Sequence, residues 1–374
     1  MKFMHLADLH LGKRVNGFSM LEDQKYILDE ILEITDREAP GAILIAGDVY
    51  DRSIPPEEAV TLFDGFLSAL AGRGIPVYLI SGNHDSSERL AFGGRLMEGA
   101  GVFLSPVYNG EIRPLSLWDE WGEILLWPIP FLKPAEVRRF FPEAEIGSYT
   151  EAMAAVIAAM NIDPAKRNVA LVHQFITGGS ICDSEERSVG GLDDISAEVF
   201  APFDYVALGH LHGPQEISRP GIRYAGSPLK YSFSEAEQKK SVTLAELGEK
   251  GELKIRTIPL LPMHDLVRLR GSFSDLTQDG AGTNDYAEIT LLDEEDVPNA
   301  VSRLQKYYPN LMTLRYDNTR TRHRTDVLET AHAERKTPLE LFGELYEKQN
   351  GRPLDGAREA YLMGLIESIW EGEA

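Results

Sequence analysis

Short apolar runs alternate with amphipathic segments through the first 260 residues of the chain. The apolar runs are four or five residues long and end in turn residues, which predicts strands, for example at 3–7, 42–46, 77–80, 169–172 and 205–208. Between them, Ile27, Ile31 and Ile34 keep the spacing of one helix face, and the segment 60–70 does the same. We therefore predict an α/β domain in which helices cover layered sheets.

A second unit follows the sequence Pro259-Leu260-Leu261-Pro262. Two prolines three positions apart interrupt both helices and strand ladders, so they predict a domain boundary. The first domain then covers residues 1–260, with its last strands at 222–225, 242–246 and 255–260. Beyond it, residues 265–320 predict a small α+β unit, with strands at 266–269, 287–292 and 311–316 and a helix around 297–308.

The final part of the chain, residues 325–374, predicts two amphipathic helices. The basic run Arg320-Thr321-Arg322-His323-Arg324 precedes it and is more typical of a solvated linker than of a phosphate contact. Thr337 and Pro338 supply an N-cap and a proline at the first helical position. The second helix carries Leu362, Leu365, Ile366 and Ile369. Two such helices cannot bury a core of their own, so their apolar faces either fold back or dock on another protein.

The charge balance narrows the possible functions. The chain has 37 basic and 59 acidic residues, a net charge of −22, which argues against a general coat for nucleic acid. Any nucleic-acid role then needs local positive charge, and bound metal ions are one source. No apolar run approaches the about 20 residues that span a bilayer, and the start of the chain has no signal-peptide pattern, so we expect a cytoplasmic protein. The single cysteine, Cys182, cannot form an intrachain disulfide.

Metal-ligand types gather where the predicted strands end. The five segments are Asp8-Leu9-His10, Gly47-Asp48-Val49-Tyr50-Asp51, Gly82-Asn83-His84-Asp85, Val172-His173-Gln174 and Gly209-His210-Leu211-His212. In an extended chain, residues i and i+2 project to the same side, so Asp8 pairs with His10, and His210 with His212. Taken singly, each segment is more often a hydrogen-bonded core histidine, a loop start or a cap. Together they hold five of the nine histidines, which favours one shared site.

The ligand types predict divalent ions. Imidazole and carboxylate together suit Mn²⁺, Fe²⁺ or Zn²⁺, and the lack of cysteine ligands argues against a structural zinc site. Two ions about 3.5–4 Å apart that share a carboxylate can activate water and neutralise phosphate oxygens. The ligand types therefore fit a pair of divalent ions, a kind of site that can act on phosphate esters.

The order of these motifs over residues 1–230 is similar to that of the calcineurin-like metallophosphoesterases. Six longer segments resemble one branch of this superfamily, the SbcD family of bacterial nuclease subunits. They are HLADLHLGK, AGDVYDRSIPP, SGNHDS, WPIPFLKP, FDYVALGHLH and YAGSPLKYSFSE. The resemblance implies an α/β fold, a layered β-sandwich flanked by helices, followed by a small α+β capping domain and C-terminal helices.

The resemblance also implies roles for individual residues. Asp48 corresponds to a carboxylate that bridges two metal ions. One ion would take Asp8, His10 and His212, and the other Asn83, His173 and His210. His173 is not preceded by the glycine that some relatives carry. His84 corresponds to a residue that acts on the phosphodiester without binding metal, and protonates the leaving oxygen. Asp85 would orient the His84 imidazole, and we interpret Asp51 as a loop cap rather than a ligand.

The resemblance further implies cofactors, an activity and partners. The cofactors would be two Mn²⁺ ions, with Mg²⁺ as an alternative. The activity would be 3′–5′ exonuclease cleavage of duplex DNA and endonuclease cleavage of hairpins and single strands. The tail at about 337–370 would bind the SbcC ATPase in DNA end processing. A homodimer would form through helices with Leu62, Phe63, Phe66, Leu96 and Met97, although such a stripe is often core. The alternatives are another phosphoesterase, such as a phosphatase or cyclic-nucleotide phosphodiesterase, or a scaffold without activity.

Overall fold

The computed structural model describes residues 1–185 and 194–319, residue 321, and parts of the segment 339–365. Arg320 and Arg324 of the basic run lie outside the described residues, as do Thr337 and Pro338 at the predicted start of the tail. Among the described residues, no helix is both long and apolar enough to cross a bilayer.

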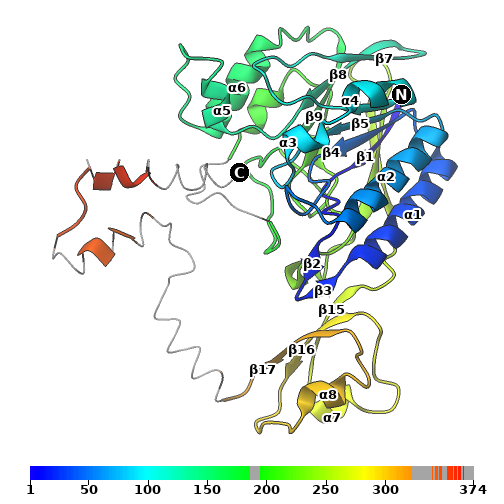
Figure 1. Ribbon diagram of the computed structural model, residues 1–374, viewed down its shortest axis with the longest axis vertical. Coiled ribbons are helices and arrows are strands. Elements are labelled where there is room, and N and C mark those ends of the chain that lie inside the picture. The colour runs from blue at the N-terminus through cyan, green and yellow to red at the C-terminus, as the bar shows by residue number, and fades with distance from the viewer. Residues whose placement is uncertain are drawn as a thin grey trace.

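Two six-stranded sheets form the first domain (Figure 1). The first has the order β14-β13-β1-β4-β5-β6, with bounds Leu253–Pro259, Ser241–Leu247, Lys2–Leu6, Ala42–Ala46, Val77–Ile80 and Val102–Leu104. The second has the order β11-β12-β10-β9-β8-β7, with bounds Gln215–Glu216, Ile222–Tyr224, Tyr205–Gly209, Arg167–His173, Gly122–Ile129 and Leu115–Asp119. The predicted layered α/β fold is confirmed.

The sheets pack face to face, and helices cover their outer faces. Between the sheets, Phe3, Leu44 and Ile80 meet Ile124 and Leu171 in one buried cluster. Helices α1 (Leu21–Glu38) and α2 (Glu57–Gly72) cover the first sheet, and α5 (Pro134–Arg138) and α6 (Tyr149–Ala159) cover the second (Figure 1). Because strands β4, β5 and β10 are buried on both faces, they are apolar throughout rather than alternating.

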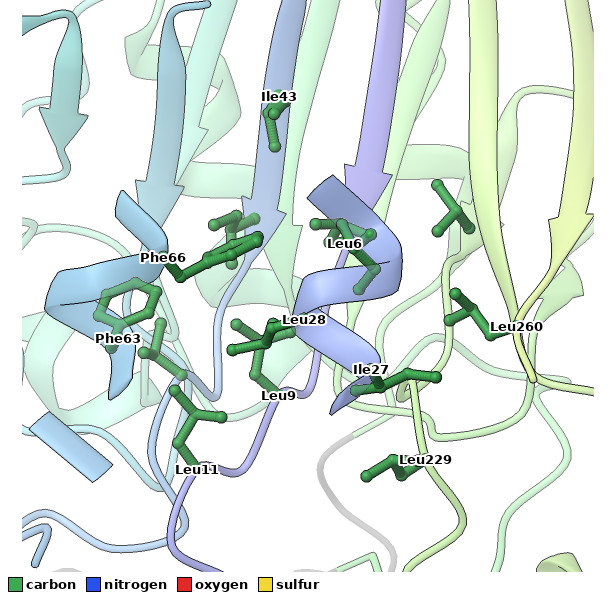
Figure 2. Packing of buried hydrophobic residues seen from close by; sticks show 14 of the residues in the cluster. Leu6, Leu9, Leu11, Ile27, Leu28, Ile43, Phe63, Phe66, Leu229 and Leu260 are labelled. Carbon is green, nitrogen blue, oxygen red and sulfur yellow. The ribbon is translucent and has the colours of Figure 1, made fainter. Parts of the chain in front are cut away.

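Two residues that were candidates for a dimer interface belong to this core. Phe63 and Phe66 on α2 are each 3% exposed and pack with Leu6 and Ile43 of the first sheet. Figure 2 shows both rings over the sheet, beside Leu28 of α1. Phe63 and Phe66 therefore belong to the core, because one face of α2 must cover the sheet, and the homodimer through these helices stays a prediction. Leu62 and Met97 are partly buried, and Leu96 is 86% exposed.

The smaller unit has its own sheet and core. Strands β15 (Leu266–Gly271), β16 (Tyr286–Leu291) and β17 (Leu311–Tyr316) run parallel, with α7 (Phe273–Leu276) and α8 (Ala300–Leu304) packed against them. Helix α8 is shorter than predicted, because turns replace it after Gln305. Tyr286 Oη donates to the buried Asp23 carboxylate of α1 at 2.7 Å, which joins the unit to the first domain.

Short elements complete the described fold. They are β2 (Arg14–Val15), β3 (Phe18–Ser19), α3 (Ser87–Leu90), α4 (Gly94–Met97) and the 3₁₀ helices η1 (Glu98–Ala100), η2 (Ala197–Phe200) and η3 (Phe233–Glu235). In the tail, Phe342, Leu345 and Tyr361 are helical and exposed.

A buried arginine at the start of β9 links the two sheets. Arg167 donates two hydrogen bonds to the Asp119 carboxylate, at 3.1 and 2.6 Å, and one to the carbonyl oxygen of Gly248, just past β13. Burial opposes the charge on Asp119, but the Arg167 guanidinium holds its pKa well below the usual range. The pair therefore ties the β7–β8 hairpin to both sheets.

We expect Asp119→Asn to lower the free energy of unfolding at pH 7 by about 2–3 kcal/mol, because it leaves Arg167 without its counter-charge. Since the pKa is depressed in the folded state, the stabilisation is present above about pH 4, the ordinary pKa, and is lost as the pH falls below it. Urea unfolding at pH 7, 5 and 3 measures both effects.

Glu123→Gln is the matched control, because Glu123 lies on the same hairpin in an exposed pair with Lys166. Equal losses in the two variants at pH 7 would contradict the assigned role of Asp119.

Candidate metal centre

The five polar segments meet at one edge of the sandwich, just beyond the strands. The backbone is left-handed at Asp8 (φ 53°), His10 (φ 44°), Asp48 (φ 49°) and His210 (φ 106°). Such conformations cost about 1–3 kcal/mol each in residues other than glycine and cluster at functional sites. The prediction that residues i and i+2 project together from an extended chain is therefore wrong, because Asp8, His10 and His210 have left-handed rather than extended backbone.

Close packing of backbone at this edge requires glycine. A Cβ on Gly209 would lie 1.8 Å from the carbonyl oxygen of Ala46, and one on Gly82 would lie 2.1 Å from Asp48 Oδ1. Any side chain at either position would push the two sheets, or the Asp48 carboxylate, out of place. The absence of a side chain at Gly82 thus leaves space for the Asp48 carboxylate.

One group of candidate ligands consists of Asp8, His10 and His212. One ligand atom of each lies within 4.8 Å of the others. His10 Nε2 and His212 Nε2 face each other at 3.0 Å. Burial lowers the pKa of both imidazoles, and for His10 the pKa falls well below the usual value. Asp8 Oδ2 is buried without a hydrogen-bond partner among the described residues. A buried carboxylate oxygen without a donor fits a cation.

A second group surrounds the amide oxygen of Asn83. Asn83 Oδ1 lies 3.0 Å from His173 Nε2 and 3.0 Å from His210 Nδ1. His173 Nδ1 donates to the carbonyl oxygen of Ala46 at 2.7 Å, which turns its Nε2 toward the site. Burial lowers the pKa of His210 to about 3. Burial acts the same way on His173, but the Asp48 and Asp8 carboxylates raise its pKa to about 9.

Asp48 lies between the two groups. Its Oδ2 is 3.6 Å from His10 Nε2 and 3.3 Å from His173 Nε2, so it reaches one member of each. Its Oδ1 accepts a hydrogen bond from the backbone N–H of His84 at 2.9 Å. Burial opposes its charge, yet the His173 imidazolium holds the pKa of Asp48 well below the usual range. His210 and His212 thus point to different groups, with Asp48 placed between them.

The prediction that Asp85 orients His84 is wrong. The Asp85 carboxylate instead accepts three backbone hydrogen bonds, from Val49, Tyr50 and Gly82 at 3.0–3.1 Å. Burial raises its pKa to about 6. His84 Nδ1 donates to the carbonyl oxygen of Asp51 at 3.1 Å, so this carbonyl orients the ring. Asp85 therefore holds the two turns together.

The Asp51 side chain accepts a hydrogen bond from Lys13 Nζ at 2.6 Å, and its Oδ1 lies 3.7 Å from His10 Nδ1. Its interpretation as a loop cap stays a prediction. Among the other histidines, His5 is buried with Nδ1 2.8 Å from Tyr205 Oη and Nε2 3.1 Å from the carbonyl oxygen of Leu208. His5 is thus satisfied within the core.

One residue that supports the site was not among the residues predicted from the sequence. Gln24 on α1 donates to the carbonyl oxygen of His10 at 2.7 Å and accepts from the Gly12 N–H at 2.9 Å, which fixes the first turn. A buried Gln on the apolar face of a helix is the one feature that marks it. His84 also lies within 4.8 Å of ligand atoms of His10 and Asp48.

The donor set fits divalent metal ions. Lone pairs of imidazoles with lowered pKa, two carboxylates and an amide oxygen converge, and the buried Oδ2 of Asp8 has no donor among the described residues. The assignment of Asp8, His10, Asp48, Asn83, His173, His210 and His212 as ligands stays a prediction.

Comparison with known proteins gives two matches to family models and several to whole proteins. The calcineurin-like phosphoesterase model matches residues 1–214, and the model described as type 5 capsule protein repressor C-terminal domain matches residues 262–350. The SbcD subunit of the SbcCD nuclease of Staphylococcus epidermidis is 34% identical over 321 residues, covering 84% of this chain and 85% of that protein. The SbcD subunit of Staphylococcus saprophyticus is also 34% identical over 321 residues, covering 84% of each.

A solved dimetal phosphatase from Danio rerio covers 70% of this chain and 98% of its own, at 11% identity and a TM-score of 0.43. That similarity is too low to carry an argument.

We expect Mn²⁺ to stabilise the protein, because it would satisfy the buried carboxylate oxygen of Asp8 that has no hydrogen-bond donor. At a Mn²⁺ concentration 100 times its Kd, the free energy of unfolding should rise by about 2.7 kcal/mol per site. Thermal unfolding with and without Mn²⁺, after treatment with chelator, measures the shift. Asp48→Asn should lose most of it, since Asp48 touches both groups, whereas His5→Asn should keep it. A wild-type protein that melts at the same temperature in both conditions would contradict the predicted site.

Proposed function

This chain belongs to the SbcD family of calcineurin-like phosphoesterases, and on that premise we propose that its metal centre hydrolyses phosphodiester bonds in DNA. The resemblance found in the motifs is thereby confirmed at the level of the family. The observation that carries the proposal is the arrangement of Asp48 between two groups of ligands, with His84 beside them. Two ions held by one carboxylate suit in-line displacement at phosphorus, and membership of the SbcD family favours DNA as the substrate.

Each group has a separate task in the proposed site. Asp8, His10 and His212 would hold one ion, Asn83, His173 and His210 the other, and Asp48 would contact both. Bound ions of this kind, Mn²⁺ by preference or Mg²⁺, neutralise phosphate oxygens and lower the pKa of water. Asn83 contributes an oxygen without adding negative charge, which leaves more positive charge to face the phosphate.

His84 is placed to move a proton. Its Nδ1 is committed to the carbonyl oxygen of Asp51, so Nε2 is the atom left to meet a substrate. The side chain is only partly buried, unlike the fully buried His10 and His173. We propose that Nε2 of His84 donates a proton to the leaving oxygen of the sugar, while the Asp51 carbonyl keeps the ring in position.

The acidic surface requires help in binding DNA. At a net charge of −22, long-range attraction to a polyanion is unfavourable, so contact depends on the metal ions and on a partner. We propose that the tail at about 337–370 docks on the SbcC ATPase, which fits the exposed Phe342, Leu345 and Tyr361. Because its substrate would be DNA, we propose that the protein acts in the cytoplasm.

A nuclease assay tests the proposal. We expect the protein, with Mn²⁺ or Mg²⁺ and with and without the copurified ATPase, to cleave linear and hairpin duplex DNA far faster than small phosphate esters. His84→Gln should bind the same amount of metal as the wild type but lose about 10²–10⁴-fold in cleavage rate, the usual contribution of a proton donor.

Ser86→Ala is the matched control on the same turn, because Ser86 caps α3 and touches none of the ligands. Two results would count against the proposal: preference for small esters over DNA would remove the nuclease assignment, and full activity in His84→Gln would remove its role as acid.

We also propose that two copies associate through the exposed apolar residues of the α3–α4 region. Phe92 is 85% exposed and Leu96 is 86% exposed, whereas Phe63 and Phe66 are committed to the core. Leu96→Glu should therefore reduce self-association without changing stability. Sedimentation equilibrium should find twice the 41.6 kDa of one chain for the wild type and a single chain for the variant. A wild type that is monomeric at every concentration would contradict the dimer.

A further inference from the structure

A buried ion pair lies directly behind His212. Glu235 is fully buried, Lys240 is 5% exposed, and Lys240 Nζ donates to Glu235 Oε2 at 2.6 Å. Removing two charges from water is costly, and a buried pair is often no more stable than apolar residues of the same size. The burial of the Glu235–Lys240 ion pair therefore indicates a role other than stabilising the fold.

The second oxygen of Glu235 leads to the metal centre through a serine. Ser184 Oγ donates to Glu235 Oε1 at 2.5 Å and lies 2.8 Å from His212 Nδ1. The direct distance from His212 Nδ1 to Glu235 Oε1 is 3.6 Å, too long for a hydrogen bond. The three groups thus form a relay in which Ser184 is the middle member.

The relay fixes which nitrogen of His212 carries the hydrogen. A serine hydroxyl has one hydrogen, and the carboxylate, which can only accept, takes it. Ser184 Oγ must then accept from His212, so the ring hydrogen is on Nδ1. The lone pair is left on Nε2, the atom that faces His10 Nε2 at 3.0 Å.

Charge keeps the relay in this direction. Burial disfavours the ionised form of Glu235, but the Lys240 ammonium, 2.6 Å from its Oε2, favours that form. A protonated Glu235 would become a donor and could turn the Ser184 hydroxyl toward His212. Lys240 therefore maintains Glu235 as an acceptor.

The backbone of His212 is held by the same residues and their neighbours. Lys240 Nζ donates to the His212 carbonyl oxygen at 2.8 Å, and Glu185 Oε1 accepts from the His212 N–H at 2.5 Å. Both peptide groups and the ring of His212 are thus constrained from segments more than 20 residues away in the chain.

We propose that Glu235 is a positioning residue for the metal centre: acting through Ser184, it sets the tautomer and orientation of His212 so that Nε2 can bind a divalent ion. This inference rests on the proposed function of His212 as a ligand. Within the described part of the chain, no corresponding relay reaches Asn83, His173 or His210, since His173 Nδ1 is held by the Ala46 carbonyl instead. Loss of the relay should therefore weaken one ion and spare the other.

The experiment compares Ser184→Thr with Ser184→Val, which have the same shape and differ in the hydroxyl. Titration of chelator-treated protein with Mn²⁺ should give two ions in the wild type and in Ser184→Thr. In Ser184→Val, and in Glu235→Gln, one ion should bind about 10–100-fold more weakly while the other is unchanged. Ser234→Ala is the matched control, because Ser234 Oγ accepts from the Asp183 N–H on the same loop without touching His212.

A second measurement does not depend on metal. Nitrogen NMR of ¹⁵N-histidine-labelled, metal-free protein should find the Nδ1–H tautomer for His212 in the wild type and in Ser184→Thr, but a mixture in Ser184→Val. If Ser184→Val binds both ions with unchanged affinity and keeps this tautomer, the relay is overturned and the metal site stands. A wild type that shows the tautomer but binds no Mn²⁺ would overturn the proposed function instead.

Discussion

The close approach of the two sheets at the carbonyl oxygen of Ala46 is the contact on which the site depends. Ala46 ends β4 of the first sheet, and its carbonyl accepts a hydrogen bond from His173 Nδ1, at the end of β9 in the second. Gly209 at the end of β10 packs against the same carbonyl, with no room for a Cβ. Ligands from both sheets can reach one another only because the strand ends meet this closely.

Burial on this scale makes the site electrostatically unfavourable on its own. Asp8 and Asp48 are carboxylates in a nearly dry interior, surrounded by imidazoles whose neutral forms are favoured by burial. Burial raises the pKa of Asp8 well above its usual range, whereas the His173 imidazolium lowers that of Asp48. The left-handed backbone at four of these residues adds strain. Divalent ions would offset both effects, since they neutralise the carboxylates and use the lone pairs.

Hydrogen bonds from residues outside the predicted ligand set orient the histidines of the site. The Ala46 carbonyl fixes His173, the Asp51 carbonyl fixes His84, and the Ser184–Glu235 pair fixes His212. Backbone carbonyls can only accept, so they impose a tautomer whatever the pH. Glu235 imposes one only while it is ionised, which explains the buried Lys240 beside it. The metal centre is therefore as much a product of its supporting hydrogen bonds as of its ligands.

The sequence by itself determined the strands, the ligand types and their place at strand ends, because these follow from local periodicity and from residues adjacent in the chain. Runs such as 42–46 and 77–80 match β4 and β5, and the Asp and His residues after them do converge. The boundary between the domains stays a prediction.

Only the tertiary structure decided the contacts across long separations. The carbonyl oxygen of Asp51, rather than the side chain of Asp85, orients His84. Phe63 and Phe66 face the core. Glu235 reaches His212 through Ser184. The residues in these contacts are 28 to 51 positions apart or belong to different helices and strands. No local periodicity of the sequence encodes such contacts. They depend on how two sheets and three loops pack, and that packing is fixed by the core rather than by any motif.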